Sequence, residues 1–131
     1  MLKKIVSAAA LLALFAGPST FAADTGYVPD RKELQRSEVP GSNYVTVMAV
    51  TTIDPGKVVA RHTHPGVEIS YVLEGEGDFV IEGKKQHVKA GGSFRLEPKV
   101  RHSVLNGSST MKILAVYIIP KGEPVATPAP E

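Results

Sequence analysis

His62 and His64 are separated by one residue, and Glu68 follows four residues after the second histidine. In an extended strand, side chains two residues apart project from the same face, so the two imidazoles share a surface. Glu68 joins that surface if the chain passes the intervening residues without a change of register. Two imidazoles and one carboxylate are ligand types of a divalent transition-metal site. This segment is therefore the first candidate for chemistry in the chain.

Alternation along a strand over 58–64 predicts where these histidines point. Val58 and Ala60 lie on the same face as both histidines, and their apolar character marks that face as the interior. The same test on a later strand places His102 and Val104 inside. Three imidazoles in an apolar interior are costly unless they are paired, and a metal ion removes that cost.

The direction of Glu68 stays open in this pattern. Ile69, Tyr71 and Leu73 lie on the opposite face of their strand, which makes the expected outer face the more apolar one. Either this strand is covered on both sides, by the N-terminal arm or by a second subunit, or the loop at 65–66 shifts the register. We favour the first alternative, which also predicts a homodimer.

The glycine frame around these residues resembles two signatures of the cupin superfamily. The first signature matches Gly56, His62, His64, Glu68 and Gly75 in spacing. The second matches Gly91, His102 and Asn106 within GGSFRLEPKVRHSVLN, although Glu97 replaces its proline and Lys99 its second glycine. The resemblance covers roughly residues 44–119. It implies an all-β fold, a single cupin barrel (double-stranded β-helix or jelly roll), with four metal ligands: His62, His64, Glu68 and His102.

The resemblance also implies a function. Four ligands of this kind leave an open position, which is typical of a reactive rather than a structural site. The metal is a divalent transition ion: Fe, Mn, Ni, Cu or Zn. We expect a metal-dependent, dioxygenase-type enzyme acting on a small organic substrate, with Glu68 also serving as the catalytic base. The alternative is a non-catalytic cupin that binds a small molecule or the metal itself.

Residues 1–22 are typical of an export signal, with Lys3 and Lys4 before an apolar run and cleavage expected after Ala22. We therefore expect a periplasmic or secreted protein, with no membrane association after signal removal. The chain contains no cysteine, so disulfides cannot stabilise it and any metal site must use nitrogen and oxygen ligands.

The remaining chain predicts one domain with two flanking segments. Residues 23–43 form an N-terminal arm, 44–119 the barrel and 120–131 a proline-rich, disordered tail. Short β-rich runs separated by Gly and Pro predict strands from 44–53 to 111–119. The net charge of +2 equals the contribution of the two signal lysines, and no basic patch remains for nucleic acid. His87 lies outside both signatures, and we assign it no chemistry.

Overall fold

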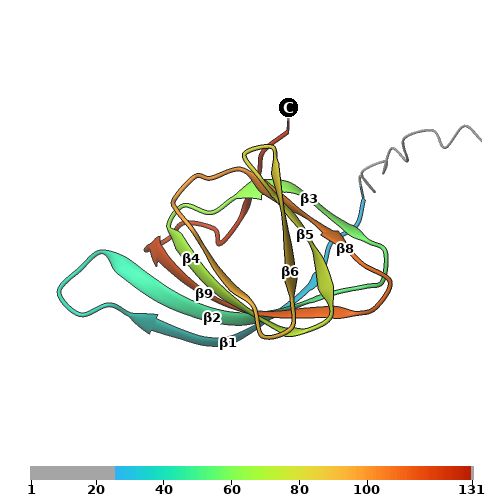
Figure 1. Cartoon of the computed structure of the whole chain (residues 1–131). Helices are drawn as coiled ribbons and strands as arrows, with labels where there is room; N and C mark the ends of the chain where they lie inside the picture. Colours follow the sequence, from blue (N-terminus) through green and yellow to red (C-terminus); the bar gives the residue numbers. More distant parts are fainter. Residues whose placement is uncertain (1–25, 131) are drawn as a thin grey trace, which may run out of the picture.

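The computed structural model describes residues 26–130, which form ten β-strands and no helix within that range (Figure 1). This arrangement confirms the all-β prediction. The strands are β1 (Asp30–Glu38), β2 (Tyr44–Ile53), β3 (Val58–Thr63), β4 (Val67–Glu74), β5 (Glu76–Ile81), β6 (Lys84–Lys89), β7 (Ser93–Leu96), β8 (His102–Asn106), β9 (Met111–Pro120) and β10 (Thr127–Pro128).

The strands form two five-stranded antiparallel sheets that face each other as a barrel (Figure 1). One sheet has the order β1-β2-β9-β4-β7 and the other the order β10-β3-β8-β5-β6. The hairpin of β1 and β2 extends beyond the side of the barrel. Because the two sheets contribute inward-facing side chains from opposite walls, residues distant in the sequence meet inside.

Burial alternates strictly along β2 and β9, so these two strands contribute many of the core side chains. In both strands every second side chain is buried, as the β-branched pattern of the sequence predicts. The buried apolar residues form two clusters. One contains Ile53, Val59, Val72, Phe79, Val88, Val104, Met111 and Ile113. The other contains Val45, Val47, Ala49, Ala115, Tyr117 and Ile119.

Both flanking segments pair with the barrel. Residues 30–38 of the arm add β1 to the edge of a sheet, antiparallel to β2. In the tail, Thr127 and Pro128 pair with β3, and the Ala129 amide donates to the Arg61 carbonyl. Composition predicted a mobile tail, but pairing with the edge of β3 satisfies its backbone groups and orders it.

The residue that replaces a signature glycine adopts a conformation that usually favours glycine. Lys99 has a φ of 66°, in the left-handed region, and its amide donates to the His64 carbonyl at 2.9 Å. The loop before β8 therefore keeps a glycine-like turn without the glycine. This turn connects the backbone of the His62–His64 segment to the strand that begins at His102.

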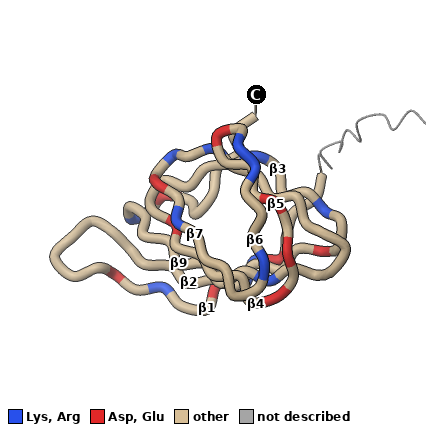
Figure 2. The backbone as a smooth tube through the Cα atoms, in the orientation of Figure 1, with Lys and Arg blue, Asp and Glu red and all other residues tan. Residues whose placement is uncertain are grey.

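Positively and negatively charged residues are interspersed along the backbone of the described part of the barrel (Figure 2). Among residues 26–130, no helix is long and apolar enough to cross a membrane. The export signal expected at 1–22 lies outside the described residues.

Candidate metal centre

A register shift in β3 (Val58–Thr63) turns His62 toward the interior, and the buried His64 follows directly after the strand. Val59 pairs with Val104 of β8, whereas His62 pairs with His102, so β3 contains one extra residue between these pairs. Val59 is buried and Ala60 is exposed, which is the reverse of the predicted alternation. The prediction that Val58 and Ala60 mark the inner face was therefore wrong. The extra residue restores the inward direction at His62.

Glu68 enters the interior from the opposite sheet. It lies on β4 beside Tyr117 of β9, and only 5% of it is exposed. The preceding loop depends on Gly66, where a Cβ atom would lie 1.8 Å from the Ile118 carbonyl oxygen. That close approach leaves room for no side chain at this position. Because Glu68 is buried and Ile69 is exposed, Glu68 lies on the inner face, and the alternative of a loop shift is excluded.

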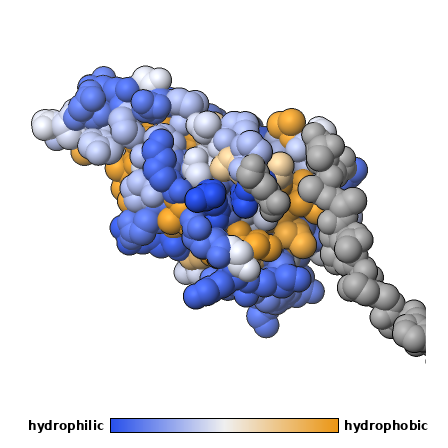
Figure 3. All heavy atoms as spheres, turned by 90° about the horizontal axis from the view of Figure 1, so that it is seen from above, coloured by the Kyte–Doolittle hydropathy of each residue, from blue (hydrophilic) through white to orange (hydrophobic). Residues whose placement is uncertain are grey.

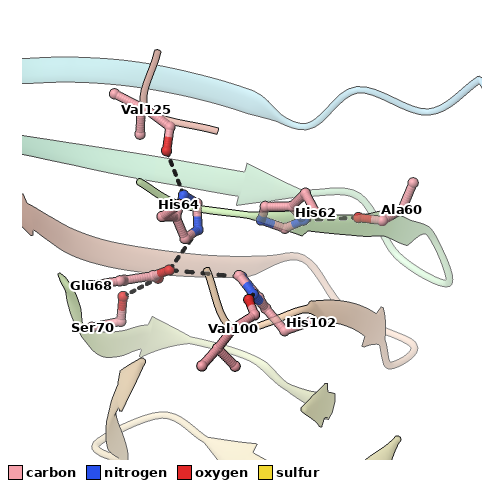
Figure 4. Close-up of polar contacts among 8 residues, drawn as sticks. All are labelled: Ala60, His62, His64, Glu68, Ser70, Val100, His102 and Val125. Carbon is pink, nitrogen blue, oxygen red and sulfur yellow. Dashed lines mark hydrogen bonds and ion pairs between the residues drawn. The ribbon is translucent and has the colours of Figure 1, made fainter. Parts of the chain in front are cut away.

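The three histidines come together inside the barrel (Figure 4). Each histidine offers one ring nitrogen as a possible ligand atom, and these three nitrogens lie within 4.8 Å of one another. Glu68 lies beside this group, with its Oε2 atom 2.8 Å from Nε2 of His64 and 3.8 Å from Nε2 of His102. The structure thus brings together all four residues that the sequence selected.

Each imidazole is oriented by a backbone carbonyl on its outer side (Figure 4). Nδ1 of His62 contacts the Ala60 oxygen at 2.8 Å, and Nδ1 of His102 contacts the Val100 oxygen at 3.0 Å. Nδ1 of His64 contacts the Val125 oxygen at 2.6 Å. A carbonyl oxygen can only accept, so Nδ1 donates in all three rings. In the neutral imidazole Nε2 is then an unprotonated acceptor.

This arrangement leaves acceptor atoms facing one another in a buried space. With His64 in this neutral form, its Nε2 and Oε2 of Glu68 both present lone pairs across 2.8 Å, and Oε2 is buried. The other carboxylate oxygen, Oε1, accepts a 2.6 Å hydrogen bond from Ser70. A proton or a metal ion between the two acceptors removes their repulsion, and the set of three imidazoles and one carboxylate fits a metal ion.

Burial sets protonation states that suit metal binding. Burial, together with the charge of His102, lowers the pKa of His62 to about 4. Burial also lowers the pKa of His102. For Glu68, burial opposes ionisation, but the contacts with His64 and Ser70 outweigh it, and the net pKa is lowered. Neutral His62 and His102 beside an ionised carboxylate are the forms that bind a divalent metal.

The space at the centre is small. A cavity of about 30 Å³ lies among the four residues, with Arg31, Thr51 and Tyr117 also in its wall. Such a volume holds one or two water molecules and excludes an organic molecule. The ring of Tyr117 lies 4.8 Å from that of His64, and burial raises the pKa of this phenol. Tyr117 therefore stays a neutral wall residue.

Sequence reasoning missed two participants. Arg31 reaches the cavity wall from β1, and the Val125 carbonyl orients His64 from the tail. No local motif marks either residue, because each reaches the centre through a pairing across the barrel edge. By contrast, Asn106 of the second signature is structural: its Nδ2 donates to the carbonyls of Ile53, Asp54 and Ser109.

His87 lies away from the centre, as expected. Its side chain is 56% exposed, and its two ring nitrogens contact Asp78 at 2.9 Å and Glu76 at 3.1 Å. These carboxylates raise the pKa of His87. The residue belongs to a solvated charge cluster on the outer face of β5 and β6.

Comparison with known proteins agrees with this geometry. The chain is 37% identical over 79 residues to the oxalate-binding protein of Thermotoga maritima, a match that spans 59% of this chain and 65% of that relative. The matched stretch is therefore less than two thirds of the relative's length.

Two solved structures share the fold. A protein from Klebsiella pneumoniae with a double-stranded β-helix domain matches with a TM-score of 0.63 at 23% identity, covering 88% of this chain and all of that one. The DMSP lyase DddQ of Ruegeria pomeroyi matches with a TM-score of 0.66 at 20% identity, covering 86% of this chain and 57% of that one. At these identities the likeness concerns the fold alone.

The sequence profile of the cupin domain family matches residues 49–117, which contain the three histidines, Glu68 and both glycine frames. The match covers more than half of the chain and coincides with the barrel strands from β2 to β9. The chain therefore belongs to the cupin domain family.

Proposed function

We propose that this protein is an exported, metal-dependent cupin that catalyses a dioxygenase-type reaction on a small organic substrate. His62, His64, His102 and Glu68 would hold a divalent transition metal, which supplies Lewis-acid and redox chemistry when bound. The observation that carries the metal assignment is the shared orientation of the imidazoles, each with Nδ1 donating to a carbonyl and Nε2 free for coordination.

Glu68 is the group best suited to move a proton. Its carboxylate is ionised and buried, and Ser70 holds one oxygen while the other faces the histidines. A base needs an unprotonated oxygen in a fixed orientation toward the reacting group. We propose that Glu68 accepts a proton from the bound substrate, in addition to its role as a ligand.

The experiment is oxygen uptake with catechol-like and enediol substrates, using metal-saturated wild type and the Glu68→Gln variant. This change nearly preserves side-chain volume but removes the negative charge and the base. We expect turnover to fall by about 10²- to 10⁴-fold in the variant, the usual cost of losing a general base. The Glu76→Gln variant, which alters an exposed carboxylate beside His87, is the control and should keep full activity. A Glu68→Gln variant at the wild-type rate would rule out the base role.

A second candidate is a non-catalytic cupin that captures a small ligand. The 37% identity to a protein named for oxalate binding favours it. The two candidates differ in one measurable result. A binding protein shows ligand-induced thermal stabilisation without oxygen uptake or product, and its Glu68→Gln variant still takes up the ligand once metal is saturating.

We further propose that the mature protein is periplasmic or secreted and forms a homodimer. The export signal supports the first proposal, and the apolar outer face of β4 supports the second. The localisation is tested by mass spectrometry of the periplasmic fraction and the medium. We expect a chain that begins at Ala23, after cleavage behind Ala22.

A further inference from the structure

A second, larger cavity lies next to the metal centre. It has a volume of about 310 Å³ and is bounded by residues 27–29 and Arg31 on one side, 59–62 of β3 at its base and 126–128 of the tail on the other. We call this cavity the vestibule. The segments before β1 and after β9 thus form its two walls. In the view from above, hydrophobic residues gather beside the point where the described chain begins, within a largely hydrophilic surface (Figure 3).

The vestibule adjoins the 30 Å³ cavity of the metal centre. Pro29, Arg31, Val59 and His62 line both spaces, so these residues form the boundary between them. Since the inner cavity excludes an organic molecule, a ligand of the metal centre must keep its body in the vestibule. Only one end of the ligand can reach past His62.

The lining of the vestibule favours an anionic ligand with an apolar body. Tyr27, Val28, Pro29, Ala126 and Pro128 supply apolar surface. Two arginines, Arg31 and Arg61, also line the space, and no Asp or Glu does. Arg61 is engaged by the tail, where its Nε donates to the Ala129 carbonyl at 2.8 Å. Arg31 is therefore the cation placed to meet a ligand.

Arg31 lies at the boundary between the two cavities and has an unused hydrogen-bond donor. Its Nε is buried and has no hydrogen-bond partner among the described residues, and none of their carboxylates forms an ion pair with it. Its guanidinium carbon lies 5.6 Å from the centroid of the Tyr117 ring, which steadies the side chain from one side. A buried donor without a partner is costly, and a bound carboxylate removes that cost.

We infer that the vestibule binds a small carboxylate with an apolar body, and that Arg31 holds its carboxylate at the entrance to the metal centre. Arg31 is then a specificity-determining residue, because it selects anionic over neutral ligands. This inference rests on the proposed metal-dependent function, whose substrate class it names. The planar fork of arginine suits a carboxylate better than the single ammonium of lysine.

The test is calorimetric titration of the zinc-loaded full chain with benzoate and with its uncharged counterpart, benzamide. We expect wild type to bind benzoate at least tenfold more tightly than benzamide. The Arg31→Gln variant should lose about 10- to 100-fold in benzoate affinity, as expected for a hydrogen bond between charged groups. Arg31→Lys should recover only part of the loss. The control is Arg36→Gln, on the same strand, where the arginine is exposed and paired with Glu33 at 2.9 Å; it should bind benzoate as wild type does.

Melting temperature and zinc content are measured for every variant, so that misfolding or metal loss is recognised. Benzoate affinity unchanged in Arg31→Gln would overturn the inference, as would equal affinity for benzamide or no benzoate binding by wild type at millimolar concentration. If wild type retains no zinc, the proposed metal-dependent function fails. The same titrations on the metal-free protein then still decide whether Arg31 recognises a carboxylate.

Discussion

At the scale of single residues, the direction of each imidazole matters more than its presence. Three backbone carbonyls fix Nδ1 as the donor in His62, His64 and His102, and this leaves every Nε2 directed to the interior. Outer contacts of this kind fix the tautomer of a metal-binding histidine and raise its basicity. The backbone thus fixes the direction of all three rings.

Protonation of these residues predicts a pH dependence of stability. The pKa of His62 is about 4 in the folded chain, against 6.5 for the ordinary side chain. Between these values the unfolded chain binds more protons, so the unfolding free energy of the metal-free protein should fall as the pH drops from about 6.5 to about 4. Protons also compete with metal for each nitrogen. The stabilisation by added zinc should thus shrink over the same interval.

Thermal melts at pH 7.5 and pH 5, with zinc and with a chelator, measure this effect. We expect zinc to raise the melting temperature clearly at pH 7.5 and much less at pH 5. The exposed His87 provides the control, since His87→Gln should leave the zinc effect unchanged. A melting temperature indifferent to the chelator at pH 7.5 would contradict the prediction.

Sequence spacing selected four side chains that lie together inside the barrel, but it predicted their surroundings poorly. Both glycine frames and the alternation within β8 identified the three histidines and Glu68. The alternation within β3 gave the correct direction for His62, but for the wrong reason, because a register shift after Val59 reverses the faces. An extra residue in one strand is visible only when the partner strand is known.

At the scale of elements, the two terminal segments complete the centre. The tail pairs with β3, and its Val125 carbonyl orients His64. The arm adds β1, which brings Arg31 to the cavity wall. Their composition predicts neither role, since prolines and charges are equally common in disordered segments. Each segment is ordered because it pairs with a strand that would otherwise be the edge of a sheet, β2 for the arm and β3 for the tail.

Removal of the tail should therefore weaken metal binding. A chain that ends after Glu123 lacks the Val125 carbonyl and β10, so the His64 ring loses its outer hydrogen bond. We expect zinc affinity to fall by about 10- to 100-fold, the usual cost of losing such a contact. Competition with a chromogenic chelator measures the affinity. The matched control ends after Ala129 and keeps both contacts; equal affinities in the two shortened chains would show that the tail does not support the centre.

At the scale of the whole molecule, one face of the barrel is unusually apolar. Ile69, Tyr71 and Leu73 on the outer face of β4 are 48%, 47% and 43% exposed. They lie beside Leu114 and Val116 of the neighbouring strand β9, which are half-buried and also face outward. The arm forms an edge strand and leaves this face uncovered. An apolar face of this kind is typical of a protein–protein interface.

We predict that this face forms a homodimer. Sedimentation of the wild type at micromolar concentration should give the mass of two chains, and Tyr71→Lys should give one, because a charge cannot be buried there without a partner. Val28→Lys introduces the same charge at an exposed apolar residue of the vestibule and should remain dimeric. A monomeric wild type would refute the prediction.

The central claim is that His62, His64, His102 and Glu68 bind one transition-metal ion. Its most direct test is elemental analysis of the purified chain, as isolated and after loading with excess zinc followed by desalting. We predict one equivalent of metal per chain in wild type and in the His87→Gln control. The His62→Ala and His102→Ala variants should each retain far less, because each loses a neutral donor. Wild type without stoichiometric metal after loading, or equal retention in the His102→Ala variant, would contradict the claim.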